Sequence, residues 1–414
     1  GFETICPWRV SGIDSGVDDT EFRRNSGEPW MLLLEHDAKT LLGHYGLPVP
    51  SGIYLKAGQN YSKRTLPPGP WMVKAQTATG GRGNAGGIRT CEQTETLDPV
   101  RRDLEGLTIG NLPVHGCRVE SRVEFEHEGY VSLSLNTVTG LVDILVSPVG
   151  GVQIESAVAD GAPLHRASAL PERAAIIAAG TPLIDTLEGD PQALHKVLED
   201  LAAAFLDLEA ILLEINPLFI LPDGDCLLGD AKLVLDGNAF SRQPQIESLI
   251  EDRSVDYPEA CLKQHHGFDF IVTDPNGAVG LLTTGAGLSM MLCDELKTRG
   301  LQPYNFCDIR TGGLRDDPQR LVDVLNWLCC ASHTRVILVN IFAGITDLAV
   351  FAALLVRALD ELSVPVLPVI ARLTGPNAAR ATRILDSSQF DITVYPDLGP
   401  ALDAVDQLLA TSSL

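Results

Sequence analysis

The sequence lacks the signatures of several protein classes. Its nine cysteines include no CxxC pair, so neither a zinc site nor a disulfide framework is expected, and a reducing, cytoplasmic location is favoured. No run of about 18 apolar residues occurs, which argues against a membrane-spanning helix, and the beginning, GFETICPWRV, does not read as a signal peptide. Basic residues are few, 31 against 54 acidic ones, for a formal charge of −23. Nucleic acid and anionic membranes are therefore disfavoured as partners.

The two common phosphate-binding signatures are also missing. The GKT or GKS of a P-loop is absent, and the glycines of the loop after Lys74 do not open a helix after their strand, so a Rossmann fingerprint does not fit either. Instead, the stretch PWMVKAQTATGGRGNAGG places Lys74 at a predicted strand end and continues into a loop with five glycines in eight residues. The amide groups of such a loop can fold over phosphate oxygens, while Lys74 and Arg82 supply positive charge. The loop is a candidate lid over a nucleotide triphosphate, and a mobile surface loop is the alternative.

The length of 414 residues predicts two or three domains. We expect an N-terminal extension over residues 1–28, a mixed α+β domain over 29–245, a linker over 246–266 and a second domain over 267–414. In the last of these, five strands alternate with helices: VGLLTT, the strand near Tyr304, VILVNIF, VLPVIA and ITVY. This rhythm predicts an α/β domain with a parallel sheet and helices on both of its faces.

A hairpin, ILLEINPLFI then LPDGD then CLLGDAKLVL, is the clearest in the chain. If the loop centres on its aspartate, Asn216 lies opposite Asp230 and Glu214 lies opposite Lys232, all on one face. The oxygens of Asn216 and Asp230 suit Mg²⁺, which leaves its other positions to phosphates and water. The alternative is a solvated hairpin face with a Glu214–Lys232 ion pair.

Two further glutamates, Glu120 and Glu128, are candidates for holding an adenine edge or ribose hydroxyls, because carboxylates accept hydrogen bonds from such donors. The alternative is a charged strand edge or loop, since the surrounding segment ESRVEFEHEG is rich in charge.

Three loops should gather at the carboxyl ends of the parallel strands, where crevices form and helix N-termini attract anions. They are TTGAG, DIRTGG and NIFAGIT, and their amides could hold a carboxylate with Arg310 as a bidentate partner. Ordinary strand-to-helix turns are the alternative. No nucleophile is evident, because none of the nine histidines falls in a glycine-rich helix-entry loop.

Over about residues 31 to 410 the chain resembles the β subunit of succinyl-CoA synthetase, of the ADP-forming acyl-CoA synthetase family. The resemblance rests on these segments in the family's order: LLEHDAKTLLGHYGLPVP, VKAQTATGGRGNAGG, VGGVQIES, LLEINPLFI, DAKLVLDGNAF, TTGAGLSMMLCDEL and LVNIFAGIT. It implies an N-terminal ATP-grasp domain followed by a flavodoxin-like, doubly wound parallel-sheet domain.

The resemblance also implies roles by position. Nucleotide-binding positions match Lys74, Gly81, Arg82, Gly83, Glu120 and Glu128. The Mg²⁺ ligands match Asn216 and Asp230, and Glu214 matches a catalytic carboxylate that steadies a phosphohistidine. The acid-binding positions fall at Thr284, Arg310, Gly344, Ile345 and Thr346.

In this family the γ-phosphate of ATP passes to a histidine of an α subunit and then to a carboxylic acid, and CoA attacks the acyl phosphate. The resemblance thus implies Mg²⁺, ATP and CoA, and an α subunit that carries the histidine and most of the CoA site. Thr284 stands where the family usually has an asparagine, and Ala343 replaces a glycine, so the acid need not be succinate. Two other hypotheses stay open: an ATP-grasp carboxylate–amine ligase, and a non-catalytic nucleotide-binding regulatory subunit.

Overall fold

The chain divides into two compact units between Ile246 and Glu247 in the computed structural model, which describes residues 30–110, 112–151, 161–311 and 317–411. The predicted extension over residues 1–28 lies outside the described residues. The segment expected to be a linker forms two helices, α7 (Pro244–Asp252) and α8 (Pro258–His266). Within the ranges just given, no helix has both the length and the apolar character needed to cross a membrane.

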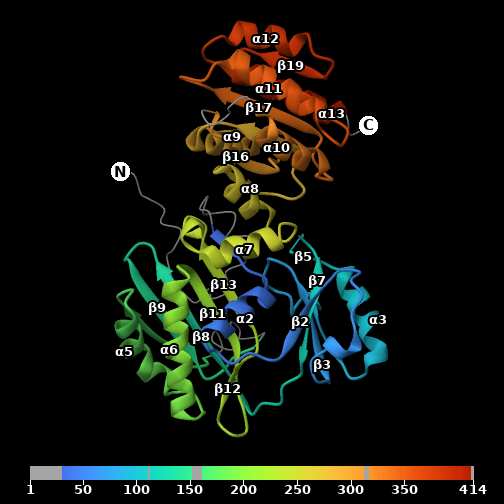
Figure 1. Cartoon of the computed structure of the whole chain (residues 1–414). Coiled ribbons are helices and arrows are strands. Elements are labelled where there is room, and N and C mark those ends of the chain that lie inside the picture. Colours follow the sequence, from blue (N-terminus) through green and yellow to red (C-terminus); the bar gives the residue numbers. More distant parts are fainter. Residues whose placement is uncertain (1–29, 111, 152–160, 312–316, 412–414) are drawn as a thin grey trace. The chain divides into compact units, whose positions relative to one another are not determined.

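The N-terminal unit contains a seven-stranded sheet with the order β1-β13-β11-β8-β9-β10, and β12 pairs with β11. Its strands are β1 (Trp30–Leu32), β8 (His127–Asn136), β9 (Leu141–Ser147), β10 (His165–Ala169), β11 (Ala210–Ile220), β12 (Cys226–Leu228) and β13 (Ala231–Asp236). Helices α5 (Arg173–Ile184) and α6 (Pro191–Asp207) lie against this sheet (Figure 1). Pro191 opens α6, and the Asp190 carboxylate accepts a hydrogen bond from the Ala193 amide, which satisfies a donor of the first turn.

A second, four-stranded sheet of this unit has the order β2-β7-β3-β4. Its strands are β2 (Gly52–Lys56), β3 (Trp71–Gln76), β4 (Ile88–Cys91) and β7 (Gly116–Ser121). Helix α3 (Thr94–Glu105) packs against it, and β5 (Thr108–Ile109) pairs with β6 (Leu112–Pro113). Helix α2 (Glu35–His44) contacts β13 of the larger sheet. The predicted mixed α+β architecture is confirmed.

The hairpin register is the predicted one. Glu214 pairs with Lys232 across β11 and β13, and Leu218 pairs with Leu228 across β11 and β12. Between these pairs, the amide of Asn216 donates to the carbonyl of Asp230 at 3.3 Å. Alternation along the strands therefore places the polar groups of the hairpin near one another.

The C-terminal unit contains a parallel sheet with the order β15-β17-β18-β19. Its strands are β15 (Val279–Thr283), β17 (Val336–Phe342), β18 (Val369–Thr374) and β19 (Ile392–Tyr395). Its helices are α9 (Ala286–Thr298), α10 (Gln319–Cys330), α11 (Leu348–Asp360), α12 (Ala378–Asp386) and α13 (Leu398–Thr411). One apolar core contains side chains of α10, α11 and α12, and another contains those of α9 and α13. The doubly wound arrangement is confirmed.

The prediction of five strands in one parallel sheet is wrong in one element. Strand β16 (Asn305–Asp308) forms its ladder with β14 (Asp269–Val272), which is antiparallel, and only a single parallel bridge, Val279–Pro303, joins the adjacent backbone to β15 in the described residues. It still lies beside β15, because the buried Asn305 side chain accepts from the Leu281 amide at 2.8 Å and donates to the Leu281 carbonyl at 2.9 Å. A side-chain amide thus takes the place of ladder hydrogen bonds at this strand.

Candidate functional site

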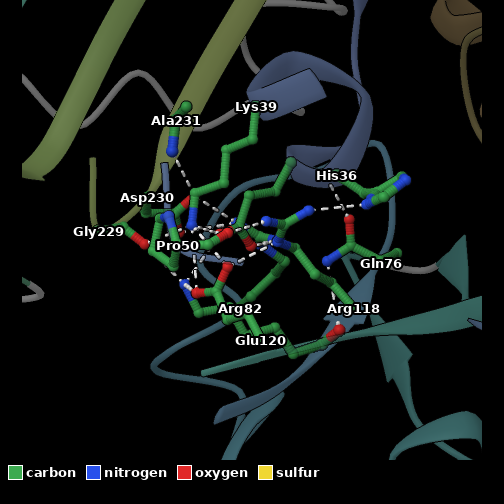
Figure 2. Close-up of polar contacts among 12 residues, drawn as sticks. His36, Lys39, Pro50, Gln76, Arg82, Arg118, Glu120, Gly229, Asp230 and Ala231 are labelled. Carbon is green, nitrogen blue, oxygen red and sulfur yellow. Dashed lines mark hydrogen bonds and ion pairs between the residues drawn. The ribbon is translucent and has the colours of Figure 1, made fainter. Parts of the chain in front are cut away.

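Seven charged side chains of the N-terminal unit meet in one place, and we call them the charge cluster. Its members are Glu35, Lys39, Lys74, Arg82, Arg118, Glu120 and Asp230. Figure 2 shows Lys39, Arg82, Glu120 and Asp230 converging beneath α2. Four cations face three carboxylates, so the cluster carries one positive charge in excess. The net charge of the cluster is therefore opposite in sign to the formal charge of the whole chain, which is −23.

Glu35 connects three of the cations. Its carboxylate lies 2.8 Å from Lys39, 2.9 Å from Lys74 and 2.8 Å from Arg82, and its side chain is 0% exposed. Burial alone would raise the pKa of Glu35, but the three cations outweigh burial and hold that pKa well below its usual range. The three ion pairs thus favour the anionic form of Glu35.

Glu120 binds the cluster from the side of the smaller sheet. Its carboxylate lies 2.6 Å from Lys74, 2.9 Å from Lys39 and 2.6 Å from the Arg118 Nε. The Gly229 carbonyl accepts a further hydrogen bond from each lysine, both at 2.7 Å. Both lysines are thus buried with their ammonium groups paired, as buried charges must be.

The predicted lysine and the predicted glycine loop lie together. Burial would lower the pKa of Lys74, but Glu35 and Glu120 outweigh burial and raise it. The loop after β3 is closed by backbone hydrogen bonds, among them Gly87 N to Arg82 O at 2.8 Å. Gly81 has a φ of +72°, a conformation that glycine adopts without strain.

The side chain of Arg82, a residue of the glycine-rich loop, contacts Asp230 of the hairpin. Its guanidinium donates to both carboxylate oxygens of Asp230, at 2.8 and 2.7 Å, and also contacts Glu35. Both bonds come from one guanidinium nitrogen, and because both partners are charged they are stronger than hydrogen bonds between neutral groups. The arginine expected to contact phosphate therefore binds the aspartate expected to bind metal.

The two side chains predicted to bind Mg²⁺ carry oxygens of the kind that such an ion takes, and their role toward it stays a prediction. Asn216 Oδ1 accepts from the Gly151 amide at 2.6 Å, and Asp230 lies at the paired hairpin position. One amide and one carboxylate oxygen are the donor set of a cation that takes its remaining ligands from phosphates and water. In the described ranges, no group of three or more His, Cys, Asp or Glu side chains forms a site that would hold a metal alone.

The two glutamates predicted for the adenosine moiety lie on different sheets. Glu120 is on β7 and pairs with cluster cations, whereas Glu128 is on β8, and burial raises the pKa of its carboxyl. A Cβ on Gly151 would lie 2.7 Å from Glu128 Oε2, so Glu128 packs against the backbone that donates to Asn216. Their predicted contacts with the nucleotide stay predictions.

The structure brings together the three loops of the C-terminal unit. Asp308 Oδ1 accepts from the amides of Gly285 at 2.8 Å and Arg310 at 3.3 Å, and the hydroxyls of Thr311 and Thr346 lie 3.1 Å apart. Residues 312–316, which include the glycines of the middle loop, lie outside the described residues.

Of the predicted acid-binding residues, Arg310 has a local partner. Its side chain is 61% exposed and lies 3.5 Å from Asp269. Thr284 is half-buried and directly follows β15. The space beside Gly344 is open, because a Cβ added there would have no neighbouring atom within 4 Å, and Ile345 is 95% exposed. The roles of these residues toward an acid stay predictions.

Sequence reasoning assigned no role to Glu35, Lys39 or Arg118. Glu35 and Lys39 stand four residues apart in EHDAK and read as an ordinary ion pair within a helix. Arg118 contacts Glu120 two residues away and donates to the Pro50 carbonyl at 2.9 Å. In the sequence, the only feature that marks these three residues is that their side chains are ionisable. Their burial becomes visible only in the fold.

Comparison with known proteins agrees with this geometry. An ATP-grasp domain family model matches residues 32–220, and a CoA-ligase family model matches residues 282–399. The class that the fold and site define is therefore an ATP-grasp protein with a CoA-ligase domain.

Relatives narrow this class to a family. The β subunit of the ADP-forming succinate–CoA ligase of Salmonella dublin is 31% identical over 92% of this chain and 99% of its own, and that of Salmonella newport gives the same values. The chain belongs to the family of these β subunits. The ATP citrate lyase of Methanothrix soehngenii, solved with citrate and coenzyme A, shares the fold with a TM-score of 0.60, 17% identity, and coverage of 92% of this chain and 100% of that one.

Proposed function

We propose that this chain is the nucleotide-binding β subunit of an ADP-forming carboxylate–CoA ligase, acting with an α-type subunit on a carboxylic acid that need not be succinate. The observation that carries the proposal is the meeting of Lys74 and Arg82 with Asn216 and Asp230 at one corner of the N-terminal unit. Cations for phosphates and oxygens for a metal are the parts that phosphoryl transfer requires, because its catalysis rests on positioning and charge stabilisation.

Each residue has a defined task in this proposal. Lys74, Arg82 and the amides of Gly81 and Gly83 hold the phosphates, and Glu120 and Glu128 orient the nucleoside end. Asn216 and Asp230 would hold Mg²⁺, which when bound neutralises phosphate charge. Glu214, on the same hairpin, would steady a phosphohistidine supplied by the partner.

The acid would bind at the loops of the C-terminal unit. Thr284, Arg310, Gly344, Ile345 and Thr346 lie in loops that Asp308 and Thr311 tie together. Backbone amides at helix N-termini and an arginine suit a carboxylate. The thiol of CoA would attack the acyl phosphate formed there, giving the thioester and releasing inorganic phosphate, and the CoA would be bound mainly by the partner. The free thiols of the described residues fit a cytoplasmic enzyme.

The test is ADP release by the chain co-expressed with its genomic neighbours, scanned over di- and tricarboxylic acids and hydroxy acids, with and without CoA. We expect turnover that requires both an acid and CoA. Turnover with an amine in place of CoA would indicate a carboxylate–amine ligase, and no ADP release from a stable, partnered complex would indicate a non-catalytic subunit.

Asp230→Ala is the variant that tests the site. It should lower phosphoryl transfer by at least about 100-fold, since even indirect partners of a metal are worth 10- to 100-fold. Asp225→Ala, at an exposed residue of the same hairpin loop, is the matched control and should leave activity unchanged. Near-normal phosphorylation by Asp230→Ala would overturn the metal assignment.

A further inference from the structure

Glu35 has a role that no sequence pattern assigned. We propose that Glu35 is the positioning residue of the nucleotide site, and that its one carboxylate sets the spacing at which Lys74 and Arg82 meet the phosphates. The inference rests on the proposed function, because it presumes that these cations bind a nucleotide.

A role in helix capping does not explain Glu35. An acidic residue in a first helical turn commonly stays near the surface and stabilises the positive end of the helix dipole. Glu35 instead is fully buried, and its carboxylate contacts Lys74 of β3 and Arg82 of the glycine-rich loop, 39 and 47 residues away. The N-cap residue of α2 is Leu34, without a side-chain cap. The contacts of Glu35 are therefore tertiary as well as local.

Glu35 is the link between the two cations that the proposal directs at phosphate. Glu120 forms its ion pairs with Lys39, Lys74 and Arg118, and Asp230 forms its ion pair with Arg82. Glu35 contacts Lys74 at 2.9 Å and Arg82 at 2.8 Å at once. Because Lys74 lies on a strand and Arg82 on a loop, a shared carboxylate fixes the loop cation relative to the strand cation.

Lys39 makes this carboxylate immobile. It lies 2.8 Å from Glu35, reaches Glu120 and donates to the Gly229 carbonyl at 2.7 Å. Lys39 shares the Oε1 oxygen of Glu35 with Lys74, while Arg82 contacts Oε2, so a third cation helps to hold the carboxylate that the other two contact. Lys39 thus anchors Glu35, and Glu35 positions the two phosphate-directed cations.

A role of Glu35 through its charge and a role through positioning predict opposite changes in anion affinity for Glu35→Gln. The substitution removes one negative charge from a cluster that already has a positive excess, so charge alone would strengthen the binding of an anion. Loss of position would weaken it, because Lys74 and Arg82 would no longer be held at one spacing. The sign of the change in affinity therefore separates the two roles.

The experiment is calorimetric titration of the full chain with Mg·ADP for the wild type, Glu35→Gln and Glu35→Asp. We expect Glu35→Gln to bind at least about tenfold more weakly. Glu35→Asp keeps the charge but is one methylene shorter, so it should bind more weakly than the wild type as well. Unchanged or tighter binding by Glu35→Gln, or wild-type affinity in Glu35→Asp, would overturn the inference.

A matched control separates positioning from a loss of stability. Glu105 pairs with the buried Arg101 at 2.9 Å within α3 of the same unit. Glu105→Gln should lower the melting temperature and leave Mg·ADP affinity unchanged. If Glu35→Gln does not fold, Glu35→Asp carries the test. A wild type that fails to bind Mg·ADP would overturn the proposed function itself, an outcome distinct from equal binding by the wild type and the Glu35 variants.

Discussion

Replacing Arg82 by glutamine should strengthen the binding of a divalent cation on its own and weaken the binding of the metal–nucleotide complex. The guanidinium holds both carboxylate oxygens of Asp230, at 2.7 and 2.8 Å. A cation that binds Asp230 must therefore first displace Arg82. In the proposed complex with nucleotide, Arg82 would gain phosphate oxygens in exchange, so the free-energy cost of displacing Arg82 would be offset only when the nucleotide is present.

The magnitude follows from the burial of the pair. The Arg82 and Asp230 side chains are 11% and 24% exposed, so the pair is screened less than a surface salt bridge. Hydrogen bonds to charged groups contribute about 1.5 to 3 kcal/mol. Since about 1.4 kcal/mol corresponds to a factor of ten, Arg82→Gln should bind Mn²⁺ about 10- to 100-fold more tightly than the wild type.

The assay is titration with Mn²⁺ alone, followed by electron paramagnetic resonance of the free ion, and then with Mg·ADP by calorimetry. Arg122→Gln is the matched control and should change neither value, because Arg122 is exposed and pairs with Glu92 at 2.9 Å, outside the glycine-rich loop. Asp230→Asn should lose Mn²⁺ binding. Suppose that Arg82→Gln binds Mn²⁺ no more tightly than the wild type, while Asp230→Asn binds it less tightly. This result would support Asp230 as a metal ligand and would refute the competition between Arg82 and the cation for Asp230.

Three further predictions concern stability. Gly151→Ala should cost about 1 to 2 kcal/mol, measured by chemical unfolding, because Gly151 has a φ of +90° and the added Cβ would meet the Glu128 carboxylate at 2.7 Å; an unchanged stability would contradict this backbone geometry. The depressed pKa of Glu35 stabilises the fold above the pKa of about 4.3 expected in the unfolded chain, and this stabilisation is lost as the pH falls through the lower folded pKa. Urea unfolding between pH 7 and pH 3 should therefore show a smaller acid dependence in Glu35→Gln, and an equal dependence would refute the assignment. Asn305→Leu should cost about 2 kcal/mol or more and speed hydrogen exchange at the Leu281 amide, whose acceptor it removes, whereas protection equal to the wild type would show that another group bonds that amide.

Local patterns predicted the parts of the site that depend on short stretches of chain. The hairpin register follows from a short turn and from side chains that alternate with a period of two, so Glu214 had to meet Lys232 once the turn was located. Lys74, near the end of β3, and the glycine-rich loop that follows it were also predicted from one short stretch of chain. The two halves of the chain also differed in the rhythm of their strands and helices, which predicted the class of each unit.

The network that joins these parts could not be predicted from such patterns. Glu35, Glu120 and Gly229 reach Lys39 and Lys74 from three separate stretches of chain, and their approach depends on how α2, β7 and the hairpin pack. The strand β16 was misplaced for a related reason. Its alternation with helices was correct, but its antiparallel ladder with β14 and the bonds of the Asn305 side chain to β15 are tertiary contacts, which no periodicity records.

The charge balance of the site explains how an acidic chain can bind a polyanion. The whole chain carries −23, so nucleotide binding must depend on the few cations gathered in the charge cluster. In this structure Lys74 and Arg82 are already paired with Glu35, Glu120 and Asp230. Under the proposed function, phosphate oxygens take the place of the Asp230 carboxylate at Arg82, while Glu35 keeps its contacts with Lys74 and Arg82, so binding exchanges ion pairs and adds few new ones. Such an exchange would yield less affinity than free cations would, but it would keep the buried cations paired, and the proposal then makes nucleotide binding the event that frees Asp230 for Mg²⁺.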